Sequence, residues 1–142
     1  MALEAQGPPL RVLDWAGVRR LAAGPVRLGA HTHRHFPLSR LTDDEQEREV
    51  ASSVRLIEER TGTRVTAFAY PNGESADYDA QAISVIRRLG LRCALTTRHG
   101  LARPGQDPFQ LPRIPTRAPS IALFAIRLAG LAPAEPAQVQ PA

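Results

Sequence analysis

The sequence has very little cysteine and few aromatic residues. Its single cysteine, Cys93, excludes a disulfide bond within the chain. Cys93 lies in an apolar run, which predicts a buried, unreactive thiol. Because aromatic residues make up only 5% of the 142 residues, the core is expected to depend on leucine, isoleucine, valine and alanine.

Lysine is absent: all 18 basic residues are arginines, and the formal net charge is +4. The arginines are distributed along the chain among acidic residues, and only Arg87, Arg88 and Arg92 lie close together in the sequence. Proteins that bind nucleic acid more often show a basic stripe with neighbouring aromatic residues. The charge pattern therefore argues against nucleic acid as a partner, and a small basic nucleic-acid binder is the least favoured alternative.

Long hydrophobic segments are also absent. No apolar stretch approaches the ~20 residues of a transmembrane helix, and residues 1–11 lack the basic and apolar regions of a signal peptide. Taken alone, this chain is therefore expected in the cytoplasm.

The composition, 43% hydrophobic and 23% charged, is typical of a globular protein. We expect one domain over residues 12–131, between disordered segments at 1–11 and 132–142.

Capping residues and apolar spacing predict helices that alternate with short strands. The predicted helices are 15–23, 42–62, 77–89 and 120–131, and the predicted strands are 26–31, 64–70, 91–97 and 109–116. The helix at 42–62 is the best defined, because Thr42 and Glu45 form a capping box and Gly62 follows its last turn. Two prolines place the strand at 109–116 at a sheet edge. The alternation predicts an α/β fold with a mainly parallel sheet.

Three of the four histidines fall within "HTHRH", directly after the first predicted strand. His31 and His35 are four residues apart, a spacing that places two imidazoles on the same side of a helical turn, where both reach one ion. His33 is then expected to point elsewhere. Imidazole suits zinc, nickel and cobalt. The alternative is an exposed polar loop whose histidines have no function.

Two histidines do not complete a zinc site, because catalytic zinc usually has three protein ligands and an open position for water. Asp43, Asp44 and Asp77 are candidate third ligands, although the first two lie at the start of a predicted helix.

The turn "YPNG" follows the second predicted strand, and the ends of parallel strands meet at one edge of a sheet. The histidines and this turn are therefore expected to lie together.

The same segments resemble the polysaccharide deacetylases related to chitooligosaccharide deacetylase. "GAHTHRH" resembles the H-[ST]-x-x-H metal motif of that family, with His31 and His35 at the ligand positions. "FAYPNG" is similar to the third family motif, F-R-P-P-x-G, in the F-A-Y-P-x-G variant of one subgroup, and "LPRIP" resembles the terminal strand of that subgroup. The resemblance covers about residues 12–116 and corresponds to the C-terminal part of the catalytic domain.

The resemblance implies a partial deformed (β/α) barrel and a hydrolase of carbon–nitrogen bonds. The family removes N-acetyl groups from amino-sugar polymers, so an N-acetylated glycan of the chitin or peptidoglycan type is the implied partner. A divalent ion, usually zinc, is bound in the family by one aspartate and two histidines. The family acts mostly on glycans outside the cytoplasm, whereas this sequence shows no signal peptide. These two indications conflict, so the location of the protein stays open.

Further site residues follow from the same resemblance. The backbone N–H of Asn72 matches the donor that stabilises the oxyanion, and Tyr70, Pro71 and Gly73 match substrate-binding positions. For Tyr70, packing in the core is an equal alternative. The motif arginine that orients the base is Ala69 here, and Arg113 is the candidate substitute. A structural salt bridge is the alternative role for Arg113.

The sequence also departs from the family. The first motif, with adjacent aspartates that serve as base and metal ligand, is absent, and the pair Asp43–Asp44 follows the histidines instead. The late leucine-x-histidine motif is absent too, and the context of His99 does not fit it. We therefore expect an N-terminally truncated deacetylase domain, inactive alone and completed by an N-terminal segment or an oligomer. The alternative is a non-catalytic remnant that binds metal or glycan, or a subunit of a split deacetylase.

Overall fold

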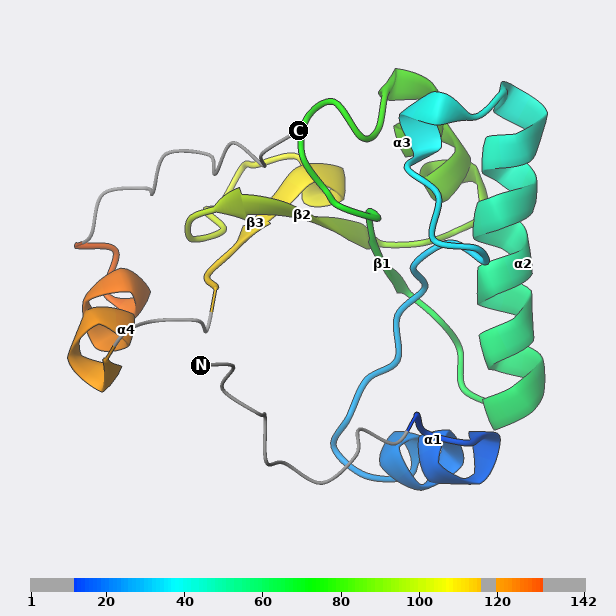
Figure 1. The fold of residues 1–142 in the computed structure, drawn as a ribbon, viewed down its shortest axis with the longest axis horizontal. Coiled ribbons are helices and arrows are strands. Elements are labelled where there is room, and N and C mark those ends of the chain that lie inside the picture. Colours follow the sequence, from blue (N-terminus) through cyan, green and yellow to red (C-terminus); the bar gives the residue numbers. More distant parts are fainter. Residues whose placement is uncertain (1–11, 116–119, 132–142) are drawn as a thin grey trace, which may run out of the picture.

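A parallel sheet organises the computed structural model, which describes residues 12–115 and 120–131. The strands are β1 (Ala67–Ala69), β2 (Cys93–His99) and β3 (Leu111–Arg113), in the order β1-β2-β3, and both pairings are parallel. Figure 1 shows β2 between its two neighbours. The predicted α/β class and the edge position of the proline-containing strand are both confirmed.

In the described part of the chain four α-helices accompany this sheet, and each begins after a polar N-cap residue. They are α1 (Trp15–Ala22), α2 (Asp43–Thr61), α3 (Ala80–Arg88) and α4 (Ile121–Leu128), with Asp14, Thr42, Asp79 and Ser120 as N-caps. The predicted capping box of α2 is present, and α2 ends at Gly62 in the left-handed conformation. Of the two candidate caps for α3, the structure uses Asp79, which accepts from Ala82 N–H at 2.8 Å.

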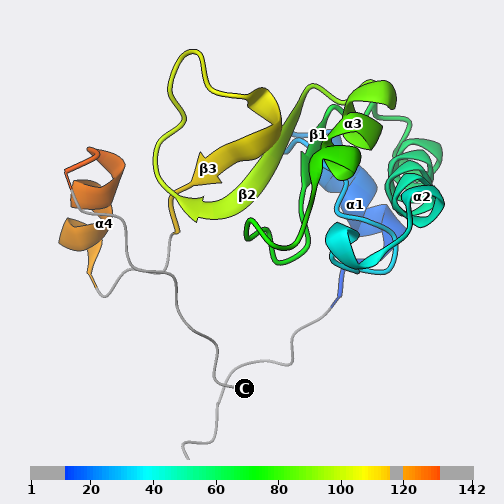
Figure 2. The same cartoon turned by 90° about the horizontal axis from the view of Figure 1, so that it is seen from above.

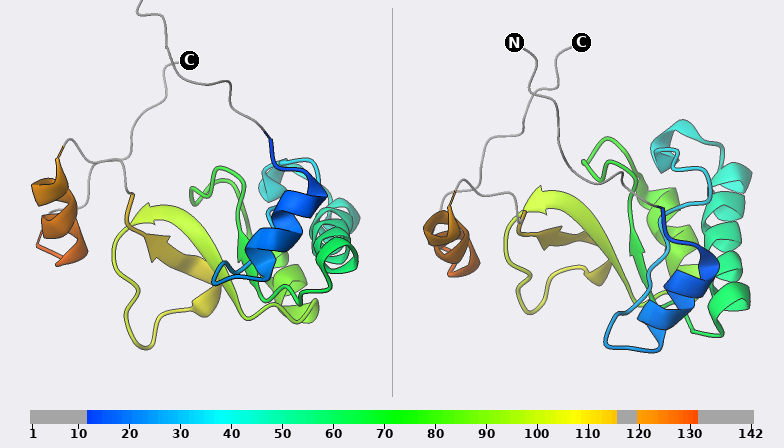
Figure 3. Two further views of the ribbon diagram at one scale, coloured as in Figure 1. Left: turned by 90° about the horizontal axis from the view of Figure 1, so that it is seen from below. Right: turned by 60° about the horizontal axis from the view of Figure 1, so that its bottom comes forward.

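The helices α1, α2 and α3 lie together on the β1 side of the molecule, whereas α4 stands beyond β3 (Figure 2). The buried core joins the sheet to α2 and α3 and includes Phe68, Ala94, Val50, Val85 and Ile86. Helix α1 lies against the C-terminal end of α2 (Figure 3), where the Arg60 guanidinium lies 5.8 Å from the centre of the Trp15 ring. None of the described helices is both long and apolar enough to cross a membrane.

The predicted strand at 26–31 is reduced to one residue. Ala30 N–H donates to the Ala67 carbonyl at 2.9 Å, and Ala69 N–H donates to the Ala30 carbonyl at 2.9 Å, which makes an isolated parallel bridge. Within the described residues no strand pairs with the other side of this segment, so these two hydrogen bonds are its whole ladder. Residue 30 is nevertheless placed firmly beside β1, directly before His31.

Two other expectations need comment. Cys93 is half-buried rather than buried, because burial alternates along β2 and Cys93 lies on the half-buried face with Leu95 and Thr97, whereas Ala94 and Thr96 are buried. The disordered segments predicted at 1–11 and 132–142 lie outside the described residues. The short 3₁₀-helices Leu38–Arg40 and Pro108–Gln110 precede α2 and β3, respectively.

Candidate metal-binding site

The histidine loop and the "YPNG" turn leave the same edge of the sheet. His31 follows the bridge residue Ala30, and Tyr70 follows the last residue of β1. The two segments touch directly, because Nδ1 of His31 lies 2.7 Å from the carbonyl oxygen of Ala69. The structure thus brings together the two sequence features that were expected to converge.

The contact with Ala69 selects one tautomer of the neutral His31 ring. A carbonyl oxygen only accepts hydrogen bonds, so Nδ1 is the donor, and in the neutral imidazole Nε2 then carries the lone pair. Such a bond from the second ring nitrogen is the usual way in which a metal-binding histidine is oriented. The His35 ring stands 4.7 Å away, centre to centre, at an interplanar angle of 73°. The two imidazoles are therefore close neighbours.

The backbone between them is not the helical turn that the spacing of four predicted. Residues 31–35 form a bent loop in which Thr32 and His35 have positive φ values of 57° and 64°. These left-handed residues turn the chain so that the first and last histidines meet. His33 is exposed, and its backbone N–H rather than its ring is the part held by the protein.

Glu49 of α2 holds this loop, and the sequence analysis did not identify it. Its Oε2 accepts the N–H groups of His33 and Arg34 at 2.9 and 2.8 Å, and its Oε1 accepts Nε of Arg34 at 2.6 Å. The side chain is only 4% exposed. Burial alone would raise the pKa of Glu49, but the hydrogen bonds from Arg34 and His33 outweigh it and hold the pKa below its usual range. Glu49 is therefore a buried carboxylate at neutral pH.

A signal for this role was present in the sequence. The acidic residues at the start of α2 suggest a solvated face, yet the buried polar residues of the helix are Gln46, Glu49 and Ser53. Together with Val50 they have the spacing of one helix face. Placing Glu49 on the buried stripe, rather than with the acidic run, would have identified it.

Two hydroxyl groups complete the surroundings of the loop. Ser53 accepts the N–H of His31 at 3.3 Å. Thr32 has its hydroxyl buried, and this oxygen has no hydrogen-bond partner among the residues that the structure describes. A buried polar atom without a partner is rare in proteins, so the loop retains an unsatisfied polar position beside the imidazole pair.

The "YPNG" turn is mostly buried. The Tyr70 side chain is 1% exposed, stacks on Tyr78 at a centroid distance of 4.0 Å and donates its hydroxyl to the carbonyl oxygen of Phe109 at 3.0 Å. The packing alternative therefore describes Tyr70, and its ring does not line a surface groove. Pro71 and Gly73 are buried as well, which leaves Asn72 as the exposed residue of the turn.

Asn72 has a left-handed backbone with a φ of 57°, and its side-chain amide donates to Asp77 at 3.3 Å. Its backbone N–H makes no hydrogen bond within the described residues. Gly73 follows with a φ of 80°, and a Cβ placed there would lie 2.8 Å from the backbone nitrogen of Thr97. Close packing against β2 thus holds an unpaired N–H at the sheet edge.

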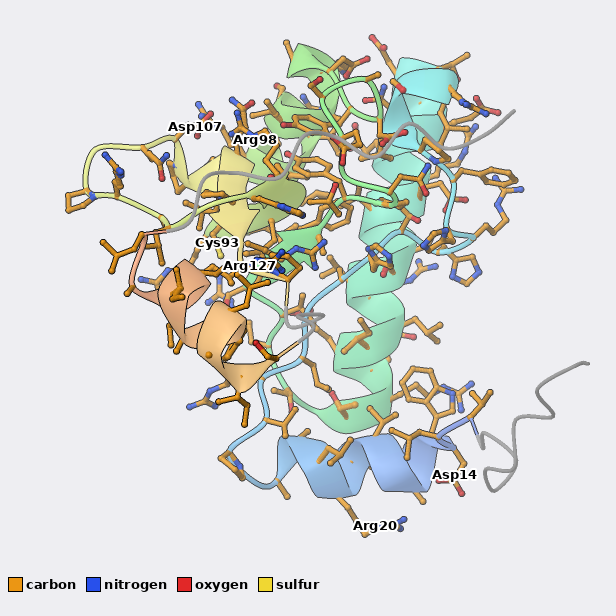
Figure 4. The ribbon with its side chains drawn as sticks, turned by 60° about the vertical axis from the view of Figure 1, so that its left-hand side comes forward. Asp14, Arg20, Cys93, Arg98, Asp107 and Arg127 are labelled. Atoms are coloured by element: carbon orange, nitrogen blue, oxygen red, sulfur yellow. The ribbon has the colours of Figure 1, made fainter. Side chains whose placement is uncertain are left out.

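Arg113 contacts the backbone of β2 rather than a carboxylate of the described residues. Its Nε donates to the carbonyl oxygen of Thr96 at 2.7 Å, and no carboxylate of the described residues forms a salt bridge with it. Its contact is therefore with the backbone of β2, which it ties to β3. A second polar cluster lies near β3, around Asp107 and Arg98 (Figure 4).

No third ligand joins the histidines within residues 12–115 and 120–131. Asp43 and Asp44 belong to the first turn of α2, and Asp77 accepts the N–H of Glu74 at 2.9 Å just after the "YPNG" turn. No group of three or more His, Cys, Asp or Glu side chains in those ranges is arranged to hold a metal ion. The described residues therefore fit two ligands of a zinc-type site, with imidazole nitrogens as donors.

Comparison with known proteins gives a consistent result. A family model described as polysaccharide deacetylase matches residues 4–94. The curated protein YxkH of Bacillus subtilis (strain 168), provisionally assigned as a polysaccharide deacetylase, is 26% identical over 97 residues. That alignment covers 68% of this chain and 34% of YxkH, so the chain spans about a third of the length of its curated relative.

Solved structures share the fold at low sequence identity. The deacetylase PplD of Streptococcus pyogenes, in complex with acetate, matches with a TM-score of 0.67 at 24% identity, over 72% of this chain and 44% of PplD. The polysaccharide deacetylase BC0361 of Bacillus cereus matches with a TM-score of 0.63 at 22% identity, over 79% and 34%. A CE4-family pseudoenzyme of Bacillus anthracis, BA3943, matches with a TM-score of 0.51 at 19% identity, over 56% of this chain and 27% of BA3943. These likenesses confirm part of a deformed (β/α) barrel.

Proposed function

This chain belongs to the polysaccharide deacetylase family, and we propose that it supplies the histidine part of a metal centre that hydrolyses N-acetyl groups on amino-sugar polymers. The observation that carries the proposal is the imidazole pair. His31 is fixed through Nδ1 to Ala69, which leaves Nε2 free, and the His35 ring lies 4.7 Å away. Two oriented imidazoles at the edge of a sheet are suited to binding one divalent ion.

His31 and His35 would hold the ion, for which zinc fits the nitrogen donors best. Bound there, zinc would polarise the acetamide carbonyl and make an attacking water more acidic. Ala69 fixes the ring of His31, and the left-handed backbone at His35 brings its ring beside that of His31. His33 takes no part in binding the ion.

Asn72 would stabilise the developing negative charge on the acetamide oxygen through its free backbone N–H. The N–H already lies in an exposed turn and requires no rearrangement of another hydrogen bond. Pro71 and Gly73 shape this turn, and Tyr70 anchors it to the core through Phe109. These three residues would thus contribute to substrate binding by holding the turn in place.

A carboxylate is still needed as a third ligand and as a general base. The carboxylate that touches the histidine loop, that of Glu49, already accepts three hydrogen bonds. Since no third ligand is arranged with the histidines within the described residues, we propose that a complementing segment or a second chain supplies it. Arg113, held through its Nε at the carbonyl of Thr96, would orient that base in place of the motif arginine. The substrate class is an N-acetylated glycan of the chitin or peptidoglycan type.

The alternative function is non-catalytic, namely a metal- or glycan-binding protein or a subunit of a split deacetylase. The lack of a third ligand and base among the described residues favours this alternative. An ion held by two imidazoles would bind water and ligands, but without a general base the hydrolysis of an acetamide there would be slow. Glycan binding without release of acetate would distinguish this alternative from the hydrolase.

The test is acetate release from N-acetylglucosamine oligomers by the full chain with added zinc. Turnover that requires His31 and survives the control change His33→Ala would support the hydrolase. Zinc or glycan binding without turnover would support the alternative. A chain that binds neither zinc nor glycan would contradict both functions.

A further inference from the structure

The loop at residues 31–35 adopts a conformation that its own backbone does not favour. It has no regular secondary structure, and two of its residues, Thr32 and His35, have left-handed backbones without being glycine. For residues with a side chain this conformation costs free energy. Contacts from outside the loop must therefore stabilise it.

Those contacts come from one face of α2. Glu49 and Ser53 are one helical turn apart, both are buried, and both accept hydrogen bonds from the loop backbone. Ser53 accepts the N–H of His31 before the first left-handed residue, and Glu49 accepts the N–H groups of His33 and Arg34 between the two left-handed residues. The helix thus fixes the loop on both sides of Thr32.

The two carboxylate oxygens of Glu49 have separate partners. Oε2 accepts both backbone N–H groups, whereas Oε1 accepts only the side chain of Arg34, which is 60% exposed. An exposed arginine gains little from such a pair, because water competes for it. A buried carboxylate needs hydrogen-bond donors, and here the loop backbone provides two of them.

We infer that Glu49 is a positioning residue for metal binding, which holds His33 and Arg34 by their backbone N–H groups so that the rings of His31 and His35 stay together. The inference rests on the proposed role of this histidine pair. Glu49 itself binds neither metal nor substrate. It acts through the loop, because the residues it holds lie between the two ligands in the chain.

Titration of the full, metal-free chain with zinc chloride by isothermal calorimetry tests this inference. Glu49→Ala removes the acceptor of both N–H groups, and its zinc affinity is expected to fall about 10- to 100-fold, as for other residues that orient metal ligands. Glu49→Gln is expected to keep most of the zinc affinity that Glu49→Ala loses, because its amide oxygen still accepts both N–H groups. Arg34→Ala removes only the bond to Oε1 and is expected to lose much less than Glu49→Ala.

Glu47→Ala is the matched control. Glu47 lies on the same helix and also pairs with an arginine, Arg88 at 2.9 Å, but it is exposed and does not touch the loop. Its zinc affinity is expected to equal that of the unchanged chain. Circular dichroism and thermal unfolding without metal would show that each variant is folded at the temperature of the titration.

The outcomes separate this inference from the proposed function. A folded Glu49→Ala chain that binds zinc as tightly as the unchanged chain, even if it unfolds at a lower temperature, would show a purely structural role and overturn the inference. If Glu49→Ala does not fold, Glu49→Asp replaces it, since its carboxylate is one methylene too short, and the same loss is expected. An unchanged chain that binds no zinc would overturn the proposed metal site and this inference together.

Discussion

The carbonyl oxygen of Ala69 lies 2.7 Å from Nδ1 of His31, so the last residue of β1 orients a ring that stands 38 positions earlier in the chain. The bond requires a proton on Nδ1 and leaves Nε2 as an acceptor. Because the carbonyl belongs to a strand of the sheet, it is a rigid support. This relationship gives a histidine in a loop a fixed orientation, as the proposed metal site requires.

Replacing either ligand is expected to remove zinc binding. His31→Ala and His35→Ala each leave a single imidazole, and one imidazole among exposed residues does not hold zinc firmly. His33→Ala is the control, since alanine retains the N–H that Glu49 accepts. Zinc titration by calorimetry measures all three variants, and equal loss in the His33 variant would contradict the assignment of the ligands.

Gly73→Ala is expected to destabilise the fold by about 2–5 kcal/mol. Alanine at its φ of 80° costs about 1–2 kcal/mol, and overlap of the new Cβ with the Thr97 nitrogen adds about 1–3 kcal/mol. Gly90→Ala is the control, because Gly90 has a φ of 77° but no atom within 4 Å of the added Cβ, so only the first cost applies. Urea unfolding would compare them, and equal losses would show that close packing at Gly73 is unimportant.

The stability of the folded chain is expected to decline above pH 10. Burial raises the pKa of Tyr70 and Tyr78 above the ordinary value of 10.0. The fold therefore favours the protonated phenols, so their contribution is complete below pH 10 and is lost as the pH rises toward their raised pKa values. The chain has no lysine to titrate in this range and only these two tyrosines.

Absorbance at 295 nm, which reports tyrosinate, measures this effect. The folded chain is expected to ionise at a higher pH than the chain in urea, and Tyr70→Phe should flatten the decline of the unfolding free energy with pH. Ionisation of both tyrosines at their ordinary pKa in the folded chain would contradict the buried placement of Tyr70.

Asp107 is expected to stabilise the fold at neutral pH and not in acid. The side chain of Gln110 and the N–H of Phe109 donate to its carboxylate, and Arg87 pairs with it at 3.0 Å; together these hold the pKa of Asp107 below its usual value. Its contribution is therefore present above pH 4 and is lost as the pH falls through the lowered pKa. Asp107→Asn should differ from the unchanged chain at pH 7, and this difference in unfolding free energy should shrink in acid. A difference independent of pH would contradict the prediction.

Much of the fold was predictable from the sequence, because its signals are local. The capping box of Thr42 and Glu45, the cap at Asp14 and the glycine after α2 act over a few residues, and the helices begin and end close to those positions. The strand at 26–31 was predicted too long, since pairing depends on a neighbouring strand and only Ala30 has one within the described residues.

The sequence predicted which histidines form the candidate site but not how the loop arranges them. The spacing of His31 and His35 indicated the ligand pair, but the helical turn assumed for it was wrong because Thr32 and His35 are left-handed. Glu49 escaped notice, since an acid near a helix N-terminus is usually solvated, and its burial depends on donors 15 and 16 positions earlier.

By itself, the sequence determined the motif "HTHRH" with the turn "YPNG", and the family to which both point. The tertiary structure decided that Ala69 orients His31, that Tyr70 packs in the core, and that Glu49 supports the loop. The physical reason is distance along the chain. Motifs and caps follow from neighbouring residues, whereas the direction of a lone pair and the burial of a carboxylate depend on hydrogen bonds between segments that only folding brings together.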